Sequence, residues 1–125
     1  MPFVTVDKGF NSGVRGRKLL ALKTEKEWRE LWETHESITT PPKPVPLVDF
    51  EREMIVVAFS GEKPSGGHGI AIVKIEEDTA KRELRVTFRE TRPPAGAMVT
   101  GALTQPYHIV KLKTTDLPVT FVSQQ

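Results

Sequence analysis

Residues 54–59 have the sequence Met-Ile-Val-Val-Ala-Phe, the longest apolar run in the chain. A short continuous apolar run is typical of a central β-strand that is covered on both faces. The run at 70–75 has the same character, and residues 84–89 alternate between apolar and polar side chains, which predicts a strand with one face in water. Four further strands are expected, at 3–6, 17–23, 107–112 and 119–122.

One helix is predicted at about 25–36. Thr24-Glu25-Lys26-Glu27 has the form of a capping box, in which the threonine hydroxyl caps the helix and the glutamate bonds back. Four residues then share one helical stripe: Trp28, Leu31, Trp32 and His35. We expect both tryptophans to be buried on the inner face of the helix, and the histidine to be half-buried at its end.

These elements predict an α+β fold that is rich in β-structure. Charged residues 76–83 would join two strands as a hairpin, and the order of elements is not a βαβ succession. We expect a mainly antiparallel sheet or sandwich of six to eight strands with one packed helix. The proline-rich segment 41–46 favours an extended connection over the surface, so residues 1–125 would form a single domain.

The composition argues against several classes of protein. The chain has 125 residues and no cysteine, which rules out disulfides, thiolate metal sites and cysteine nucleophiles. A formal net charge of +2 gives little support to nucleic-acid binding, and no apolar run approaches the roughly 18–20 residues of a membrane helix. A single asparagine and ten prolines favour a thermophilic source.

The most unusual segment is 60–69, Ser-Gly-Glu-Lys-Pro-Ser-Gly-Gly-His-Gly, which holds four of the nine glycines. It is not a phosphate-binding P-loop, because Gly67 and His68 stand where a lysine and a hydroxyl residue are needed. Two interpretations stay open. The segment is either a long hairpin loop whose glycines supply positive φ, or a binding loop, since long connections in small domains more often carry function.

Two other segments could share a rim with this loop: 92–97, which is rich in proline, and 105–108, which enters the next strand. Rigid proline loops that carry an aromatic residue and an arginine suit protein binding, because little entropy is lost on docking. The alternative is three unrelated loops. The candidate binding residues are Gly61, Lys63, Pro64, Ser65, Gly66, Gly67, His68, Arg92, Pro93 and Tyr107.

No catalytic or metal-binding signature is evident. His68 and His108 have no metal-ligand spacing, so a metal site built around them is a minor alternative. A serine hydrolase would need Ser60 or Ser65 beside one of these histidines, but the chain has no GxSxG elbow. We therefore expect no metal, no cofactor and no enzymatic activity.

Five blocks of the sequence can be compared with known families: Trp28-Arg29-Glu30-Leu31-Trp32, Val48-Asp49-Phe50, Gly61 to His68, Pro93-Pro94-Ala95-Gly96 and Thr104-Gln105-Pro106-Tyr107. They occur in the order seen in the PrcB family of protease-complex subunits, which the chain resembles over about residues 10–122. The most specific block is Gly-x-Lys-Pro-Ser/Thr-Gly-Gly, which family members usually continue with tyrosine where this chain has His68. The resemblance implies a non-catalytic PrcB C-terminal domain that associates with a secreted or surface protease and stabilises it.

The same loops are similar, more distantly, to those of chagasin-type inhibitors of cysteine proteases, which have an immunoglobulin-like sandwich. The counterparts would lie in loops 61–69 and 92–97. The functional expectation is therefore a non-enzymatic protein-interaction module whose partner is another protein, in particular a protease. The alternatives are an inhibitor that inserts these loops, and a small-ligand binder or enzyme of unknown class.

The expected location follows from two opposing indications. The PrcB resemblance implies the cell envelope or the extracellular space. The start of the chain, Met1-Pro2-Phe3-Val4, lacks the basic head and apolar core of a signal peptide. A cytoplasmic location and a chain that has lost its leader both stay open.

Overall fold

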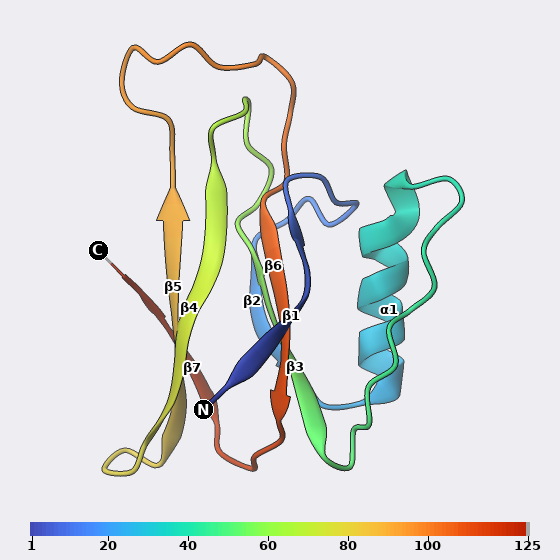
Figure 1. The fold of residues 1–125 in the computed structure, drawn as a ribbon, viewed down its shortest axis with the longest axis vertical. Helices are drawn as coiled ribbons and strands as arrows, with labels where there is room; N and C mark the ends of the chain where they lie inside the picture. Colours follow the sequence, from blue (N-terminus) through green and yellow to red (C-terminus); the bar gives the residue numbers. More distant parts are fainter. Residues whose placement is uncertain (125) are drawn as a thin grey trace.

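The computed structural model describes residues 1–124, which form seven β-strands, one α-helix and one 3₁₀ helix (Figure 1). The helices are α1 (Glu25–His35) and η1 (Glu36–Ile38). The strands are β1 (Phe3–Gly9), β2 (Lys18–Leu22), β3 (Glu53–Phe59), β4 (Gly69–Asp78), β5 (Glu83–Thr91), β6 (Tyr107–Lys113) and β7 (Val119–Ser123). The predicted α+β class, the count of six to eight strands and the single packed helix are confirmed.

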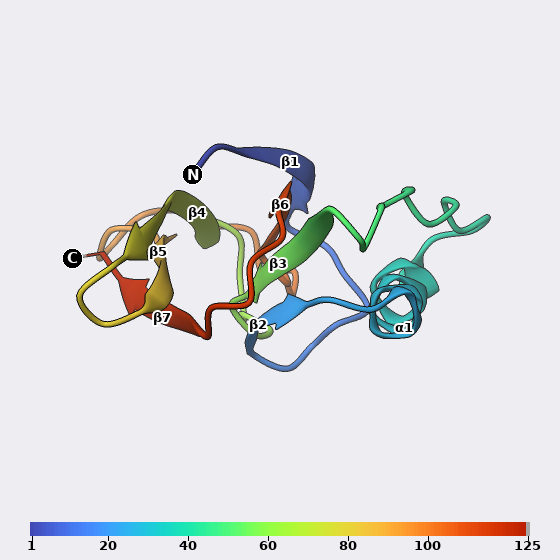
Figure 2. The ribbon, with the colours of Figure 1, turned by 90° about the horizontal axis from the view of Figure 1, so that it is seen from below.

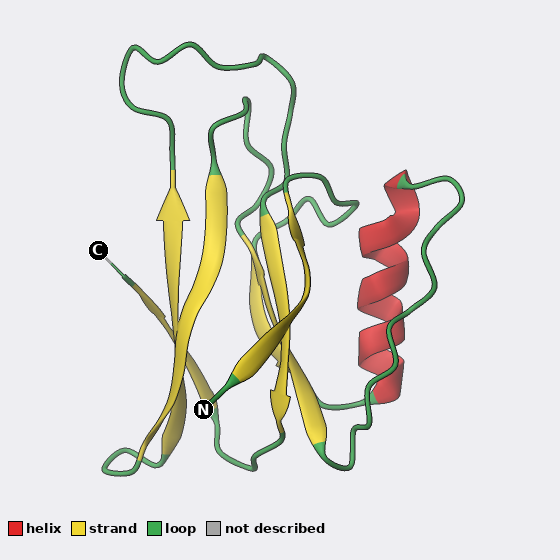
Figure 3. Cartoon of the chain, in the orientation of Figure 1, coloured by secondary structure: helices red, strands yellow, loops and turns green. Residues whose placement is uncertain are grey.

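The strands form two sheets, with the orders β1-β6-β3-β2 and β4-β5-β7 (Figure 3). All strand pairs are antiparallel except β5 and β7, which run parallel. Seen end-on, the two sheets face each other and α1 lies against the outer face of the four-stranded sheet (Figure 2). The molecule is a sandwich with a third, helical layer.

β3 lies between the two hydrophobic cores. Its even-numbered residues Met54, Val56 and Ala58 pack toward the second sheet, and its odd-numbered residues Ile55, Val57 and Phe59 pack toward α1. All six side chains are at most 1% exposed. The predicted central strand with both faces covered is confirmed, and burial of each large side chain stabilises the fold by about 1.5–3 kcal/mol.

The expectation of a second such strand at 70–75 is wrong. β4 is an edge strand, and its buried residues Ile70, Ile72 and Ile75 face one side only. The register of β4 on β5 shifts between Ile72 and Lys74. This bulge inserts one residue and turns Ile75 back to the core face, so a one-sided strand has the sequence of a continuous apolar run.

The interpretation of segment 60–68 as a hairpin loop is also wrong. β3 and β4, which it joins, belong to different sheets. The connection crosses from one layer of the sandwich to the other, a path that a two-residue turn between paired strands cannot span. The hairpin predicted across the charged residues is present, as the turn 79–82 between β4 and β5.

α1 begins as the capping box predicts, with one difference. The Thr24 Oγ1 accepts a hydrogen bond from the Glu27 N–H at 3.2 Å, but the Glu27 carboxylate accepts from the Thr24 hydroxyl at 2.8 Å instead of from the Thr24 backbone. Both tryptophans are buried as expected, at 0% and 5% exposure for Trp28 and Trp32. No helix formed by residues 1–124 has the length and apolarity that crossing a bilayer requires.

The indole groups of α1 also hold the proline-rich segment. Trp28 Nε1 donates to the Pro46 carbonyl at 3.0 Å, and Trp32 Nε1 donates to the Lys43 carbonyl at 2.9 Å. The Lys43 N–H donates to the Glu36 carboxylate at 2.7 Å. The extended path predicted for 41–46 is present, and these hydrogen bonds hold it along the helix.

Replacing Trp28 with alanine should lower the free energy of unfolding by on the order of 3–5 kcal/mol, because a fully buried indole leaves a cavity against β3. Urea denaturation measures the change. Leu47→Ala is the matched control, because Leu47 is 91% exposed and should change stability by less than about 0.5 kcal/mol. A loss below about 1 kcal/mol in the tryptophan variant would show that the helix contributes little to the core.

Segment 41–46 should resist limited digestion with proteinase K, because hydrogen bonds from both indoles hold it. Trp32→Phe keeps an aromatic ring but removes the N–H that reaches Lys43, and cleavage there should become faster. Mass spectrometry of the fragments gives the cleavage sites. Rapid cutting of the wild type into two stable pieces would contradict the prediction that residues 1–125 are a single domain.

Candidate protein-binding site

Three loops meet at the upper end of the sandwich in Figure 1: residues 10–17, 60–68 and 92–106, which we call the loop end. An isolated antiparallel bridge joins the second loop to the third, through hydrogen bonds of 2.8 and 3.0 Å between the main chains of Lys63 and Thr104. The Glu62 N–H donates to the Arg15 carbonyl at 2.9 Å, and the Gln105 N–H donates to the Phe10 carbonyl at 2.7 Å. The loops are therefore bonded to one another and are not independent.

Two glycines allow this close contact. Gly67 has a φ of +89°, which glycine adopts freely, and a Cβ there would lie 3.0 Å from the Cβ of Pro93. A Cβ on Gly66 would lie 2.6 Å from the Thr100 hydroxyl oxygen. The glycines thus serve the packing of segment 60–68 against segment 92–106.

Most of the predicted site residues lie in this end of the molecule. Lys63, Ser65 and His68 are half-buried, whereas Pro64 and Arg92 are exposed. The half-buried Gly66 and Pro93 and the exposed Gly67 form the contact between the loops. Gly61, with a φ of +92°, packs beside Arg17.

Tyr107 is placed elsewhere. It is 7% exposed and its ring stacks on Phe59 with a centroid distance of 5.8 Å. The His35 ring meets it edge-on at 4.4 Å. Burial, with the negative charge of Asp7 as the second cause, raises the pKa of the Tyr107 hydroxyl well above its usual value. This tyrosine belongs to the core under α1 and is not available on the rim.

The loop end also exposes large apolar side chains that sequence reasoning did not select. Met98 is 101% exposed, Leu103 58%, and Val99 44%, all in segment 92–106. Phe10, in the first loop, is 57% exposed. Large apolar side chains gathered at one end of a molecule are typical of an interaction surface.

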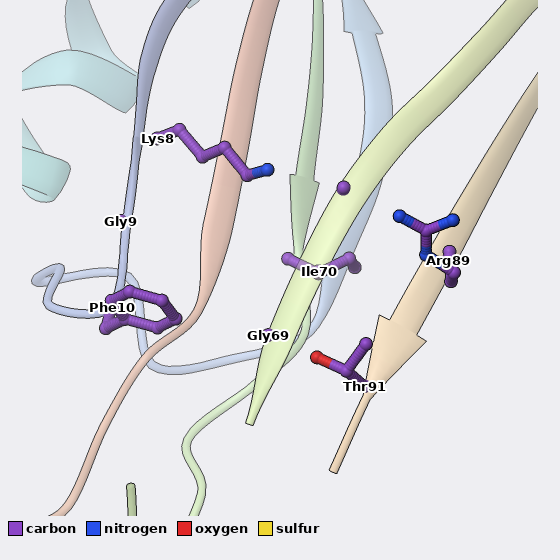
Figure 4. Close-up of a pocket in the computed structure, with 8 residues that line it drawn as sticks. Lys8, Gly9, Phe10, Gly69, Ile70, Arg89 and Thr91 are labelled. Atoms are coloured by element: carbon purple, nitrogen blue, oxygen red, sulfur yellow. The ribbon is translucent and has the colours of Figure 1, made fainter. Parts of the chain in front are cut away.

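Two open hollows lie at the loop end, beside the start of β4 and the end of β5. One, of about 350 Å³, is lined in part by Lys8, Phe10, Ile70 and Arg89 (Figure 4), and we call it the apolar hollow. The other, of about 340 Å³, is the cationic hollow, lined by Lys63, His68, Glu90, Thr91 and Arg92. Thr91 lines both, so the two hollows are neighbours.

A buried polar network lies at the far end of α1. The Ser12 Oγ is 2.7 Å from the His35 Nδ1, and the Asp7 Oδ2 is 2.9 Å from the His35 Nε2. Serine, histidine and aspartate in this sequence of contacts are typical of nucleophilic catalysis, but Ser12 and His35 are each 1% exposed, so a substrate has no access to the hydroxyl. The expectation of a half-buried His35 is wrong.

This network and the adjoining Glu36 also form the group of side chains, among residues 1–124, that could together hold a metal ion. The possible ligand atoms of Asp7, His35 and Glu36 all lie within 4.8 Å of one another. The His35 Nε2 is already engaged by Asp7, however, and the Glu36 carboxylate accepts from the Lys43 N–H. The role of the network is structural, because its hydrogen bonds connect β1 and loop 10–17 to the end of α1. The signal in the sequence was a histidine on an apolar helical stripe, which needs polar partners when buried.

His108 also has a structural environment. It is 4% exposed, and its Nδ1 accepts a hydrogen bond from the Ile72 N–H at 2.9 Å. Its Nε2 lies 2.9 Å from the Thr5 hydroxyl and carries the proton of the neutral ring. Burial, and secondarily the charge of Lys8, lowers the pKa of His108 to about 4. The neutral ring links β6 of one sheet to β4 of the other.

The serines considered for catalysis bond to carbonyl groups. Ser65 Oγ donates to the Gly66 carbonyl at 3.0 Å, and Ser60 Oγ donates to the Pro106 carbonyl at 3.4 Å. Neither hydroxyl is paired with a histidine among residues 1–124. The geometry gives no support to a serine hydrolase built on Ser60 or Ser65.

Comparison with known families adds one finding. Residues 54–113 match the family model described as PrcB C-terminal. These residues, just under half of the chain, are similar to the PrcB C-terminal family. The resemblance identified from the sequence is thereby confirmed over residues 54–113, and the match suggests a protease-associated domain. No curated protein and no solved structure gives a significant match to the chain.

The PrcB C-terminal segment contains β3 to β6 and two of the three loops of the loop end. All residues that line the cationic hollow lie within it, as do Met98, Val99 and Leu103. The apolar hollow takes Lys8, Gly9 and Phe10 from outside it. The cationic hollow and the exposed apolar side chains of segment 92–106 are thus features of the PrcB part of the chain.

Removing the titration of His108 should reduce the acid sensitivity of the fold. The pKa of His108 is about 4 in the folded protein and about 6.5 in the unfolded chain. The contribution of His108 to the free energy of unfolding is therefore complete above pH 6.5 and is lost as the pH falls toward 4. Between pH 7 and pH 5 this loss amounts to about 2 kcal/mol of the free energy of unfolding. In His108→Gln, which keeps a donor and an acceptor, the fall over this range should be smaller by that amount.

Urea denaturation at pH 7 and pH 5 measures both proteins, with His68→Gln as the control from the loop end. Comparing the fall in each variant removes the contribution of the carboxyl groups, which all three proteins share. An equal fall in the wild type and in His108→Gln would show that His108 is not held neutral by its surroundings.

Proposed function

We propose that this protein is a non-enzymatic interaction module that binds a protease through its loop end. The observation that carries the proposal is the set of exposed apolar side chains, Met98, Val99, Leu103 and Phe10, on loops that are bonded to one another. The PrcB C-terminal match supports a protease as the class of partner.

The rigidity of the loops favours binding. The bridge between Lys63 and Thr104 and the contact of Gly67 with Pro93 fix segment 60–68 against segment 92–106 before a partner arrives. The Thr104 hydroxyl adds a hydrogen bond of 2.8 Å to the Ser65 carbonyl. Loops that are already ordered lose less conformational entropy on docking, so more of the apolar burial contributes to affinity.

The non-enzymatic part of the proposal rests on the placement of the reactive groups. The Ser12–His35–Asp7 network is buried, and the hydroxyl groups of Ser60 and Ser65 are bonded to carbonyl oxygens. His68 lies in a loop and His108 is bonded to Thr5 and Ile72. These contacts are those of a scaffold and not of a site that transfers protons to a substrate.

A second candidate is inhibition of the protease by loop insertion. Segment 92–106 is the longest connection at the loop end and carries Met98, which is 101% exposed. A projecting loop with a bare apolar side chain has the form of a segment that enters a partner's cleft. The two candidates differ in their effect on the protease, which an inhibitor blocks and a stabilising subunit preserves.

The test is capture of a protease by the immobilised protein from lysate and culture medium of the source organism, identified by mass spectrometry. The double variant Met98→Ser, Leu103→Ser should retain at least tenfold less protease, because it removes apolar contact area at the loop end. Its thermal unfolding should match the wild type, since both side chains are exposed. Leu47→Ser, which removes a 91% exposed side chain from the connection after η1, is the matched control.

The activity of the captured protease over time then separates the two candidates. Slower loss of activity with the protein present supports a stabilising subunit, and a stoichiometric fall in activity supports an inhibitor. Equal capture by the wild type and the Met98→Ser, Leu103→Ser variant would reject the loop end as the binding surface.

A further inference from the structure

We infer that the loop end recognises an acidic segment of its protein partner, with a carboxylate in the cationic hollow and a neighbouring apolar side chain in the apolar hollow. This inference rests on the proposed function, because it names the chemistry of the partner at the same site. It is carried by cations that have no carboxylate partner among residues 1–124, and by the adjacency of the two hollows.

The cationic hollow has an unbalanced positive charge. Lys63 and Arg92 both line it, and among residues 1–124 no carboxylate lies within 4.0 Å of either cation. The one acidic residue of the lining, Glu90, is already paired. Arg17 donates to its two carboxylate oxygens at 2.8 and 3.0 Å, and this hydrogen bonding raises the pKa of Arg17. The hollow therefore offers a net positive surface to a ligand.

The apolar hollow extends this positively charged surface. Lys8 of β1 and Arg89 of β5 lie on either side of β4, and Phe10 and Ile70 also line the hollow (Figure 4). Neither cation has a carboxylate within 4.0 Å among the described residues. The charge of Lys8 is close enough to contribute to the lowered pKa of His108. Arg85 on β5 and Lys111 on β6, by contrast, are each paired with a carboxylate on the neighbouring strand.

The position of Lys63 is fixed by the fold. Its backbone is held in the bridge to Thr104 by two hydrogen bonds, and its side chain is half-buried beside the start of β4. Arg92 follows directly after β5. Two cations presented from fixed main chain can hold one carboxylate through charge-assisted hydrogen bonds, which are stronger than bonds between neutral groups.

The shape of the site favours a peptide chain over a lipid surface. The two hollows share Thr91, so a carboxylate in one and an apolar side chain in the other would lie close together along a single chain. Segment 92–106 extends beyond segment 60–68, which carries Lys63, so a flat bilayer that approached the loop end would meet segment 92–106 first (Figure 1). The arrangement thus fits an acidic residue followed or preceded by an apolar one.

The experiment starts with a displayed library of random twelve-residue peptides selected against the immobilised protein. Selected sequences should be enriched in Asp or Glu next to an apolar residue. The most enriched peptide is then labelled with fluorescein, and its Kd is measured by fluorescence anisotropy. Because the contacts are between charges, the Kd should rise when NaCl is raised from 50 to 300 mM.

The double variant Lys63→Gln, Arg92→Gln should raise the Kd for this peptide at least tenfold, since it removes both cations from the cationic hollow. Its melting temperature should match that of the wild type, because neither residue forms an ion pair within the described part of the chain. The matched control is Lys26→Gln, Lys113→Gln, which removes the same charge from two exposed lysines outside the loop end. The peptide with glutamine in place of its acidic residue should bind as weakly as the double variant binds the original.

Three outcomes overturn the inference: selection without acidic enrichment, an unchanged Kd in Lys63→Gln, Arg92→Gln, or an equal loss in the lysine control. Sedimentation with phosphatidylserine vesicles covers the remaining possibility, and binding there that depends on Lys63 and Arg92, with no peptide binding, also overturns it. None of these results affects capture of a protease by Met98 and Leu103. The failure of the acidic ligand and the failure of the protein-binding role are therefore distinguishable.

Discussion

The fold depends on the burial of both faces of β3. Six consecutive apolar side chains on one strand must each be covered, and alternation sends half of them to either side. The β4-β5-β7 sheet covers one face and α1, with its two tryptophans, covers the other. This fixes the order of the three layers. It also places the end of β3 between layers, so the connection to β4 must cross the top of the sandwich and there meets segment 92–106.

Local features of the fold were predictable from the sequence. The cap at Thr24 depends on residues three apart, and the stripe of Trp28 and Trp32 depends on one helical turn. The sheet to which each strand belongs was not predictable in this way. The bulge after Ile72 gives an edge strand the apolar pattern of a central strand. The residues that pair with β3 lie more than 30 positions away in β2 and more than 40 positions away in β6.

The candidate site was predictable in part. Segment 60–69 was identified because its four glycines are unusual in composition, and Gly67 does have the positive φ that only glycine adopts freely. The exposure of Met98 and Leu103 could not be inferred, because apolar residues are ordinarily assigned to a core. The sequence places Tyr107 on the rim because segment 105–108 leads into the next strand, yet the strand that Tyr107 begins turns its ring toward His35. The two hollows combine residues from β1, β4, β5 and all three loops of the loop end, an arrangement that only the tertiary structure reveals.

The parallel pairing of β7 with β5 has a consequence for how the chain is made. β7 is the last strand, and its register on β5 runs from Leu84 opposite Val119 to Phe88 opposite Ser123. During synthesis the chain can pair β4 with β5 early, but one edge of β5 stays open until the residues after Pro118 have left the ribosome. An open apolar edge is a site for wrong pairing with another chain. Closure of the second sheet thus depends on a long-range contact, and the edge of β5 stays open to wrong pairing until β7 has been made.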